Sequence, residues 1–287
     1  MGSLTDPPFS RVAIVGVGLI GGSIALAVKR RWPKVHVTAI DRKDVVDTAL
    51  AMGAADAGGD NPGYARKAEV VVLAAPVLQN VATVRTLGSY LPEPALVTDV
   101  GSTKRAIADA AAHLPAHLHF IGGHPLAGAA VGGLRAARPD LFDDRPWILT
   151  ETDRKDARLL TALTSFVSGL RAVPKRLDAI EHDRLLAYIS HLPQLAVSAL
   201  MHVVGDKAGA DGLGMAGRGL RDTTRLATSP AQTWRDIVST NSDNIALAID
   251  DLIAALQQFK ASADTTRAVD TMFVSAAKWK GVLEHEV

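Results

Sequence analysis

The chain has 287 residues, a length that fits one large domain or two domains of ordinary size. Apolar residues make up 48% of it and charged residues 21%, which excludes a disordered or low-complexity protein. Its 31 Lys and Arg side chains balance 30 Asp and Glu side chains, so we expect no nucleic-acid or membrane partner. The absence of cysteine excludes disulfides and Cys-ligated metal centres and fits a reducing cytoplasm, where we expect the protein to act.

Short runs rich in β-branched residues alternate with longer runs rich in Ala and Leu in the first part of the chain. The short runs are typical of buried parallel strands and cover residues 11–15, 35–40, 70–75, 95–100 and 119–122. Stretches of helical length separate them, which predicts an α/β fold with a Rossmann-type, doubly wound parallel sheet. Two more strands, at residues 146–150 and 170–174, are expected to complete a first domain of residues 1–175.

The pattern changes at about residue 176, where the strand-like runs end. Long segments rich in Ala and Leu follow at residues 180–204, 230–259 and 268–283. We therefore expect an all-helical second domain over residues 176–287. Ile245, Ile249 and Leu256 lie on one apolar stripe with helical spacing, which requires either another helix of the chain or a second subunit as its partner.

A glycine-rich loop directly follows the first predicted strand and precedes a predicted helix. Gly16, Gly18 and Gly21 form a GxGxxG pattern in the context that dinucleotide-binding loops require. The first glycine permits a tight turn, the second lets the backbone approach a pyrophosphate, and the third lets the helix pack close to the strand. With Leu19 and Ile20, this loop is predicted to hold a nicotinamide dinucleotide at the helix N-terminus.

The second predicted strand is followed by Asp41, twenty residues after Gly21. A carboxylate at this place accepts hydrogen bonds from the adenosine ribose and repels a 2′-phosphate, so NAD is the predicted cofactor. Arg42 and Lys43 follow at once and keep NADP open as the alternative. Pro76, after the third of these strands, is a further candidate for contact with the cofactor.

Three short segments carry candidate catalytic residues. Ligands of an open α/β sheet bind beyond the carboxyl ends of its strands, where Ser102 and His124 are expected. His124 is enclosed by glycines and a proline, which indicates a catalytic imidazole. Ser102 is expected at the start of the next helix, where an N-cap role and a role in the site can coexist. His191, in the sequence SHLPQ, is the third candidate.

No metal site is predicted. Three histidines are close in sequence, but Pro115 interrupts them and no fourth ligand adjoins them: His113, His117 and His119. His182 and His191 are nine residues apart, which places them on opposite faces of a straight helix, so we do not expect them to form a ligand pair.

Several motifs together resemble those of the prephenate dehydrogenase family, which includes arogenate and cyclohexadienyl dehydrogenases. The matching motifs are GVGLIGGS from Gly16, DVGSTK from Asp99, GGHPLAG from Gly122, EHD from Glu181, SHLPQ from Ser190, and LRDTTR with SPAQTWRDI between Leu220 and Ile237. The resemblance implies an NAD-dependent oxidative decarboxylation of prephenate to 4-hydroxyphenylpyruvate in tyrosine biosynthesis. It also implies that the protein forms a homodimer through its helical domain. The implied substrate is a small molecule.

The same resemblance implies roles for single residues. His124 would accept a proton from the ring hydroxyl, which requires a neutral imidazole, and Ser102 would orient His124 or the substrate. His191 would reach the site from the helical domain. Arg225 would bind a substrate carboxylate through its planar guanidinium, unless it forms a surface ion pair with Asp222.

One departure from the family pattern concerns the substrate. Family members that use prephenate often carry a glutamate two residues after the HPxAG motif, and here that position is Ala130. An acid near the site would favour the ammonium group of arogenate, so its loss favours prephenate. Some relatives that use arogenate also lack this glutamate, and arogenate therefore stays open as the alternative.

Two other classes of protein compete with this interpretation. A β-hydroxyacid dehydrogenase shares the expected domain plan but relies on a lysine of the second half, where Lys207 is the single lysine between Arg176 and Phe259. An NAD-binding regulator without catalysis would keep the glycine loop, but it would not need Ser102, His124 and His191 together.

Overall fold

The protein is described by a computed structural model that covers residues 6–129, 131–262 and 266–285. Its contacts divide the chain into two compact units. The first consists of Met1–Leu186 and Thr228–Asn241, and the second of Ala187–Ala227 and Ser242–Val287. The segment Thr228–Asn241 thus belongs with the sheet, although it is surrounded in sequence by residues of the helical unit.

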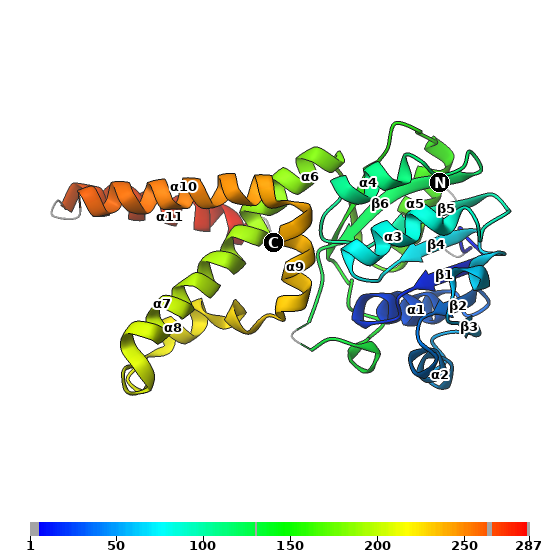
Figure 1. The fold of residues 1–287 in the computed structure, drawn as a ribbon, viewed down its shortest axis with the longest axis horizontal. Helices are drawn as coiled ribbons and strands as arrows, with labels where there is room; N and C mark the ends of the chain where they lie inside the picture. Colours follow the sequence, from blue (N-terminus) through cyan, green and yellow to red (C-terminus); the bar gives the residue numbers. More distant parts are fainter. Residues whose placement is uncertain (1–5, 130, 263–265, 286–287) are drawn as a thin grey trace. The chain divides into compact units, whose positions relative to one another are not determined.

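The first unit is built on an eight-stranded sheet with the order β3-β2-β1-β4-β5-β6-β7-β8 (Figure 1). Its strands are β1 (Arg11–Val15), β2 (His36–Ile40), β3 (Ala57–Gly59), β4 (Val70–Leu73), β5 (Ala95–Asp99), β6 (Leu118–Pro125), β7 (Pro146–Glu151) and β8 (Val173–Arg176). All neighbouring pairs are parallel except β6 and β7. The order reverses between β1 and β4, which is where ligands of such sheets bind.

Helices cover both faces of this sheet. The helices of the first unit are α1 (Leu19–Arg31), α2 (Lys43–Ala51), α3 (Val77–Leu87), α4 (Arg105–Ala111), α5 (Ala157–Gly169), α6 (Ala179–Leu186) and α9 (Ala231–Thr240). Alternate residues of β1 point to opposite faces. Val12 and Ile14 join a core with residues of α1 and α5, whereas Ala13 and Val15 join a second core with residues of α3 and α4.

The predicted fold class is confirmed, with differences at the edges of the sheet. The short strand β3 was not expected, because its sequence Ala-Gly-Gly lacks β-branched residues. The last predicted strand was placed too early, since Leu170 caps α5 and Arg171 has a positive φ of 68°. The antiparallel pairing of β6 with β7 was also unexpected, because strand direction depends on the connection between two strands and not on their composition.

The second unit is helical, as predicted. It contains a π-helical turn (Ala187–His191), α7 (Leu192–Gly214), α8 (Arg218–Thr223), a 3₁₀ turn (Arg225–Thr228), α10 (Ser242–Ala261) and α11 (Thr266–His285). The predicted helical segment at 230–259 is broken at Asn241, whose φ of −141° ends α9 before α10 starts. None of the helices in the part of the chain described here is long and apolar enough to span a membrane.

Candidate active site

The glycine loop joins β1 to α1 in a conformation that needs its glycines. Gly16 has a φ of +90°, and a Cβ there would lie 2.5 Å from the backbone nitrogen of Ala75. A Cβ on Gly21 would collide with the carbonyl oxygen of Gly16, whereas one on Gly18 would meet nothing within 4 Å. Gly16 and Gly21 therefore permit the tight turn, and the backbone at Gly18 faces open space that a pyrophosphate can approach.

The N-terminus of α1 fits an anionic ligand. Its first turn holds no acidic residue, and no side chain caps it. The backbone N–H groups of this turn can therefore donate hydrogen bonds to a phosphate, and the helix dipole favours its negative charge.

Asp41, immediately after β2, is fixed beside the glycine loop. Its Oδ2 accepts a hydrogen bond of 2.7 Å from the backbone N–H of Val17, and its Oδ1 accepts one of 2.7 Å from the N–H of Arg42. Each carboxylate oxygen has further lone-pair capacity for a ribose hydroxyl. Arg42 and Lys43, the alternative ligands for a 2′-phosphate, form ion pairs with Asp44 and Asp47.

Several of the predicted residues meet at one cavity of about 550 Å³ in the first unit. Leu19 and Ile20 of the glycine loop line it together with Pro76 and Ser102. Ala127, three residues after His124, and Trp234 of α9 line it as well. The cavity thus lies beyond the carboxyl ends of β4 and β5, where a doubly wound sheet binds its ligand.

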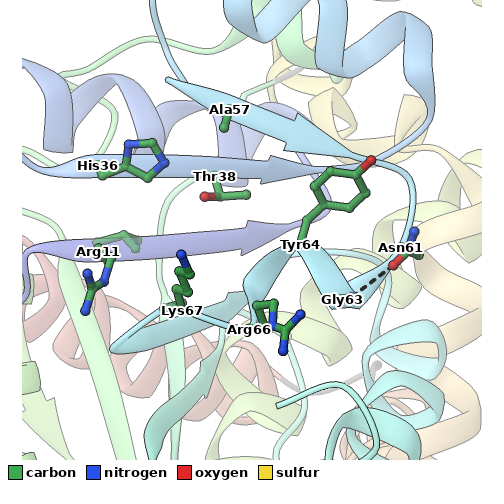
Figure 2. Close-up of a pocket in the computed structure, with 11 residues that line it drawn as sticks. Arg11, His36, Thr38, Ala57, Asn61, Gly63, Tyr64, Arg66 and Lys67 are labelled. Atoms are coloured by element: carbon green, nitrogen blue, oxygen red, sulfur yellow. Dashed lines mark hydrogen bonds between the residues drawn. The ribbon is translucent and has the colours of Figure 1, made fainter. Parts of the chain in front are cut away.

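A larger cavity of about 720 Å³ lies elsewhere in the first unit (Figure 2). Arg11 and His36, the first residues of β1 and β2, line it, and the ring of Tyr64 projects over the strands. It extends over one face of these strands, from Arg11 and His36 past Thr38 to Tyr64, and none of the predicted site residues lines it. Position in the sheet, and not volume, identifies the smaller cavity as the candidate active site.

Helix α9 closes one side of the smaller cavity. Near its middle, the carboxylate of Asp236 accepts a hydrogen bond of 3.2 Å from the backbone N–H of Leu78 in α3. At its end, the hydroxyl groups of Thr240 and Thr103 are 2.7 Å apart. These two contacts join α9 to the sheet unit and place Trp234 in the cavity wall.

A buried ion pair connects the ends of β5 and β6. Lys104 is fully buried, and its Nζ donates hydrogen bonds to Asp99 and, at 2.8 Å, to the carbonyl of Gly123. Asp99 also accepts hydrogen bonds from the backbone N–H groups of Gly101 and Gly123. The loop with Ser102 is held by this network, and Ser102 is not an N-cap, because α4 begins at Arg105 with Lys104 in the N-cap position.

His124, in β6, is the first member of a buried row of polar side chains. Its Nδ1 lies 2.9 Å from Nε2 of His182, and Nδ1 of His182 lies 2.8 Å from Oδ1 of Asp183. His182 and Asp183 are completely buried, and His124 nearly so. Asp183 also accepts hydrogen bonds from the backbone N–H groups of Lys104 and Arg105.

The surroundings set the charge of this row. Burial lowers the pKa of His182, the hydrogen bond to Asp183 opposes this effect, and the nearby Lys104 lowers the pKa further. For Asp183, burial alone would raise the pKa, but the hydrogen bonds from His182 and from two backbone N–H groups outweigh it and leave the pKa below its usual value. His182 is therefore neutral and Asp183 ionised near neutral pH.

Sequence reasoning missed four residues of this network: Asp99, Lys104, His182 and Asp183. The signal was present, because they stand in the motifs DVGSTK and EHD. A buried lysine and a buried aspartate are rare without a partner, but the partners could not be identified from spacing.

His191 and Arg225 belong to the second unit. His191 is the last residue of the π-helical turn and is buried, whereas Arg225 opens a 3₁₀ turn and is exposed. No ion pair between Arg225 and Asp222 occurs among the residues that the structure describes, so the alternative interpretation of Arg225 gains no support. The catalytic and binding roles of His191 and Arg225 stay predictions, and Ala130 lies outside the described residues.

Comparison with known proteins identifies the family of the chain in two consecutive parts of the sequence. Residues 24–175 match the family model described as the prephenate dehydrogenase nucleotide-binding domain, and residues 178–273 match the one described as the prephenate dehydrogenase dimerization domain. The prephenate dehydrogenase of Bacillus subtilis is 34% identical over 87% of this chain and 69% of its own length. This chain belongs to the prephenate dehydrogenase family.

Two further relatives extend this result. The cyclohexadienyl dehydrogenase of Zymomonas mobilis is 30% identical over 88% of each chain. A crystal structure of the Aquifex aeolicus prephenate dehydrogenase in complex with hydroxyphenyl propionate and NAD+ superimposes with a TM-score of 0.84 at 26% identity, over 96% of this chain and 98% of that one. Membership in the prephenate dehydrogenase family confirms the predicted oxidoreductase with a nucleotide-binding domain and a family dimerization domain.

Proposed function

We propose that the chain is an NAD-dependent prephenate dehydrogenase, which converts prephenate to 4-hydroxyphenylpyruvate and carbon dioxide in tyrosine biosynthesis. The observation that carries the proposal is the cavity in which the glycine loop, Pro76 and Ser102 meet, a few residues from His124. It combines a dinucleotide loop with the serine and histidine segments of a family of known chemistry.

The choice of NAD rests on Asp41 and on a relative. The carboxylate is held at the glycine loop by two backbone N–H groups, where it accepts a ribose hydroxyl and repels a 2′-phosphate. The structure of the Aquifex aeolicus relative contains NAD+. When bound, this cofactor accepts the hydride that leaves the ring carbon bearing the 4-hydroxyl.

The residues of the chain supply binding and proton transfer. His124 accepts the proton of the 4-hydroxyl while the hydride leaves the same carbon, and Ser102 orients the hydroxyl. Arg225 binds a carboxylate of the substrate and His191 helps to position it. Departure of the ring carboxylate as carbon dioxide makes the ring aromatic, which supplies the driving force.

The division of labour follows the two predicted domains. We assign residues 1–175 to dinucleotide binding and residues 176–287 to substrate binding and homodimer formation. The family model of the dimerization domain supports the second assignment. Large apolar side chains of α10 and α11 that are exposed in the single chain support it as well, among them Leu256, Phe273 and Trp279.

Arogenate is the second candidate substrate, alone or beside prephenate, because the Zymomonas mobilis relative is a cyclohexadienyl dehydrogenase. The test is kcat/KM for prephenate and for arogenate at one pH and saturating NAD. We expect the larger value for prephenate. A value for arogenate more than about tenfold larger, a difference of about 1.4 kcal/mol in transition-state binding, would reverse the assignment of the substrate.

A further inference from the structure

The buried row of His124, His182 and Asp183 has a fixed direction of hydrogen bonding. Asp183 is ionised, and a carboxylate only accepts hydrogen bonds. Its contact of 2.8 Å with Nδ1 of His182 therefore requires a proton on that nitrogen. Since His182 is neutral, its Nε2 then carries a lone pair and acts as an acceptor.

The donor and acceptor in the contact between His182 and His124 can be assigned in the same way. Nε2 of His182 lies 2.9 Å from Nδ1 of His124, so Nδ1 of His124 must donate. A neutral imidazole with a proton on Nδ1 has no proton on Nε2. The row therefore leaves the Nε2 atom of His124 as a base, which is the form that proton abstraction needs.

We propose that His182 and Asp183 are positioning residues that hold His124 in the tautomer with an unprotonated Nε2. This inference rests on the proposed function for its catalytic consequence, but not for the tautomer itself. In the reaction, Nε2 takes the hydroxyl proton as the hydride leaves the ring carbon, and it returns that proton to the ring oxygen after carbon dioxide has departed. The Nδ1–H bond to His182 is kept throughout.

The charged groups around the row come from three elements. Asp183 lies on α6, Asp99 ends β5, and Lys104 precedes α4, with the Arg105 guanidinium 3.3 Å from Asp183. Burial keeps the pKa of His182 below its usual value, and the positive charge of Lys104 lowers it further, whereas the negative charges of Asp183 and Asp99 raise it. The contact of Nδ1 with the carboxylate of Asp183 places the single proton of this ring on Nδ1.

Two substitutions of His182 test its contact with His124 and its contact with Asp183 separately. In His182→Gln, the side-chain oxygen can reach the place of Nε2 and accept from Nδ1 of His124. In His182→Asn, the shorter amide can reach the place of Nδ1 and donate to Asp183, but it leaves His124 without its acceptor. We expect kcat to fall about tenfold or more in His182→Asn and to stay within about threefold in His182→Gln, with KM and the Kd of NAD little changed in both.

A second measurement does not depend on turnover. ¹⁵N NMR of histidine-labelled protein shows which ring nitrogen carries the proton, and His124→Asn assigns the signal. We expect Nδ1–H at His124 in the wild type and in His182→Gln, and a shift towards Nε2–H in His182→Asn.

A proton on Nε2 of His124 in the wild type would overturn the proposal, and this result does not depend on the folding of a His182 variant. An unchanged tautomer and an unchanged kcat in a folded His182→Asn would overturn it as well. If the tautomers are as expected but neither prephenate nor arogenate is turned over, the proposed function fails while the positioning role stands.

Discussion

Hydrogen bonds from neighbouring groups fix the orientation of single side chains at the candidate site. Asp41 is held by the backbone of Val17 and Arg42, and His124 by the imidazole of His182. A short side chain that already has a fixed contact loses little conformational entropy when it binds a ligand. We therefore expect substitutions at these positions to change function more than stability.

The cofactor preference depends on Asp41. Asp41→Ala removes the acceptor for the ribose and the repulsion of a 2′-phosphate, so we expect the Kd of NAD to rise about tenfold and the ratio of NADP to NAD use to increase. Fluorescence titration and steady-state rates with both cofactors measure this. Asp44→Ala is the matched control, because Asp44 is exposed and its carboxylate pairs, among the residues that the structure describes, with Arg42. Equal effects of the two substitutions would count against a ribose contact.

Catalysis depends on the imidazole of His124. His124→Asn should lower kcat by about a hundredfold or more, the usual scale for loss of an acid-base group, with the Kd of NAD nearly unchanged. Stopped-flow measurement of NADH formation with prephenate checks this. Turnover close to the wild-type value would show that another group accepts the proton.

The row also makes stability depend on pH. His182 has a lowered pKa in the folded chain, so between that value and about 6.5 the unfolded chain binds more protons and stability is lost as the pH falls. Asp183, also with a lowered pKa, adds a further loss at lower pH. We expect the Tm to fall between pH 7.5 and about pH 5.5, and to fall less in His182→Gln. If the curves of Tm against pH were parallel for the wild type and His182→Gln, protonation of His182 would not lower the stability of the folded chain.

At the scale of elements, helix α9 belongs to the sheet unit, although the segments before and after it in sequence belong to the helical unit. Its predicted helical segment continued through Asn241 into α10, but the two helices belong to different compact units. The carboxylate of Asp236 accepts a hydrogen bond from α3, and the hydroxyl of Thr240 is hydrogen-bonded to Thr103 in the loop after β5; these contacts attach α9. One wall of the candidate active site is therefore built from a segment far along the chain.

Loss of this attachment has a measurable cost. Asp236→Ala leaves the N–H of Leu78 without its acceptor, and we expect a loss of about 1–3 kcal/mol in the free energy of unfolding of the sheet unit. Urea unfolding followed by Trp fluorescence measures it, with exposed Asp222→Ala as the control. Because Trp234 lines the cavity, KM for the substrate should rise as well. Identical stability of both variants would show that α9 is held by other contacts.

At the scale of the molecule, the helical unit leaves large apolar side chains exposed. On α10 and α11 of the single chain, Leu256 is 56% exposed, Phe273 65% and Trp279 63%. Such side chains on neighbouring helices are typical of an interface with another subunit. They agree with the dimerization domain that the family model identifies in residues 178–273.

Dimer formation should depend on these helices. Leu256→Glu would bury a charge in the interface, so we expect a dimer in the wild type and a monomer, or a dimer at least about a hundredfold weaker, in the variant. Light scattering and sedimentation at micromolar concentrations decide this. Leu50→Glu is the control, because Leu50 is 40% exposed on α2, outside the residues of the dimerization domain. A monomeric wild type would contradict the proposed homodimer.

The amino-acid sequence by itself determined the features that are local. The glycine loop, the alternation of strands and helices, the change to an all-helical pattern near residue 176 and the family motifs all depend on residues within a few positions of each other. These features were sufficient for the fold class, the nucleotide-binding domain and the family, which the structure and the comparisons confirm.

Only the tertiary structure decided which distant residues act together. His124 and His182 are 58 residues apart, and Lys104 and Asp183 are 79 apart, so their contacts depend on how α6 packs against α4 and the sheet. The same holds for the direction of β7 and for the division between α9 and α10. Periodicity shows which face of an element is buried, but the partner across that face is set by the packing of the whole unit, which no local pattern contains.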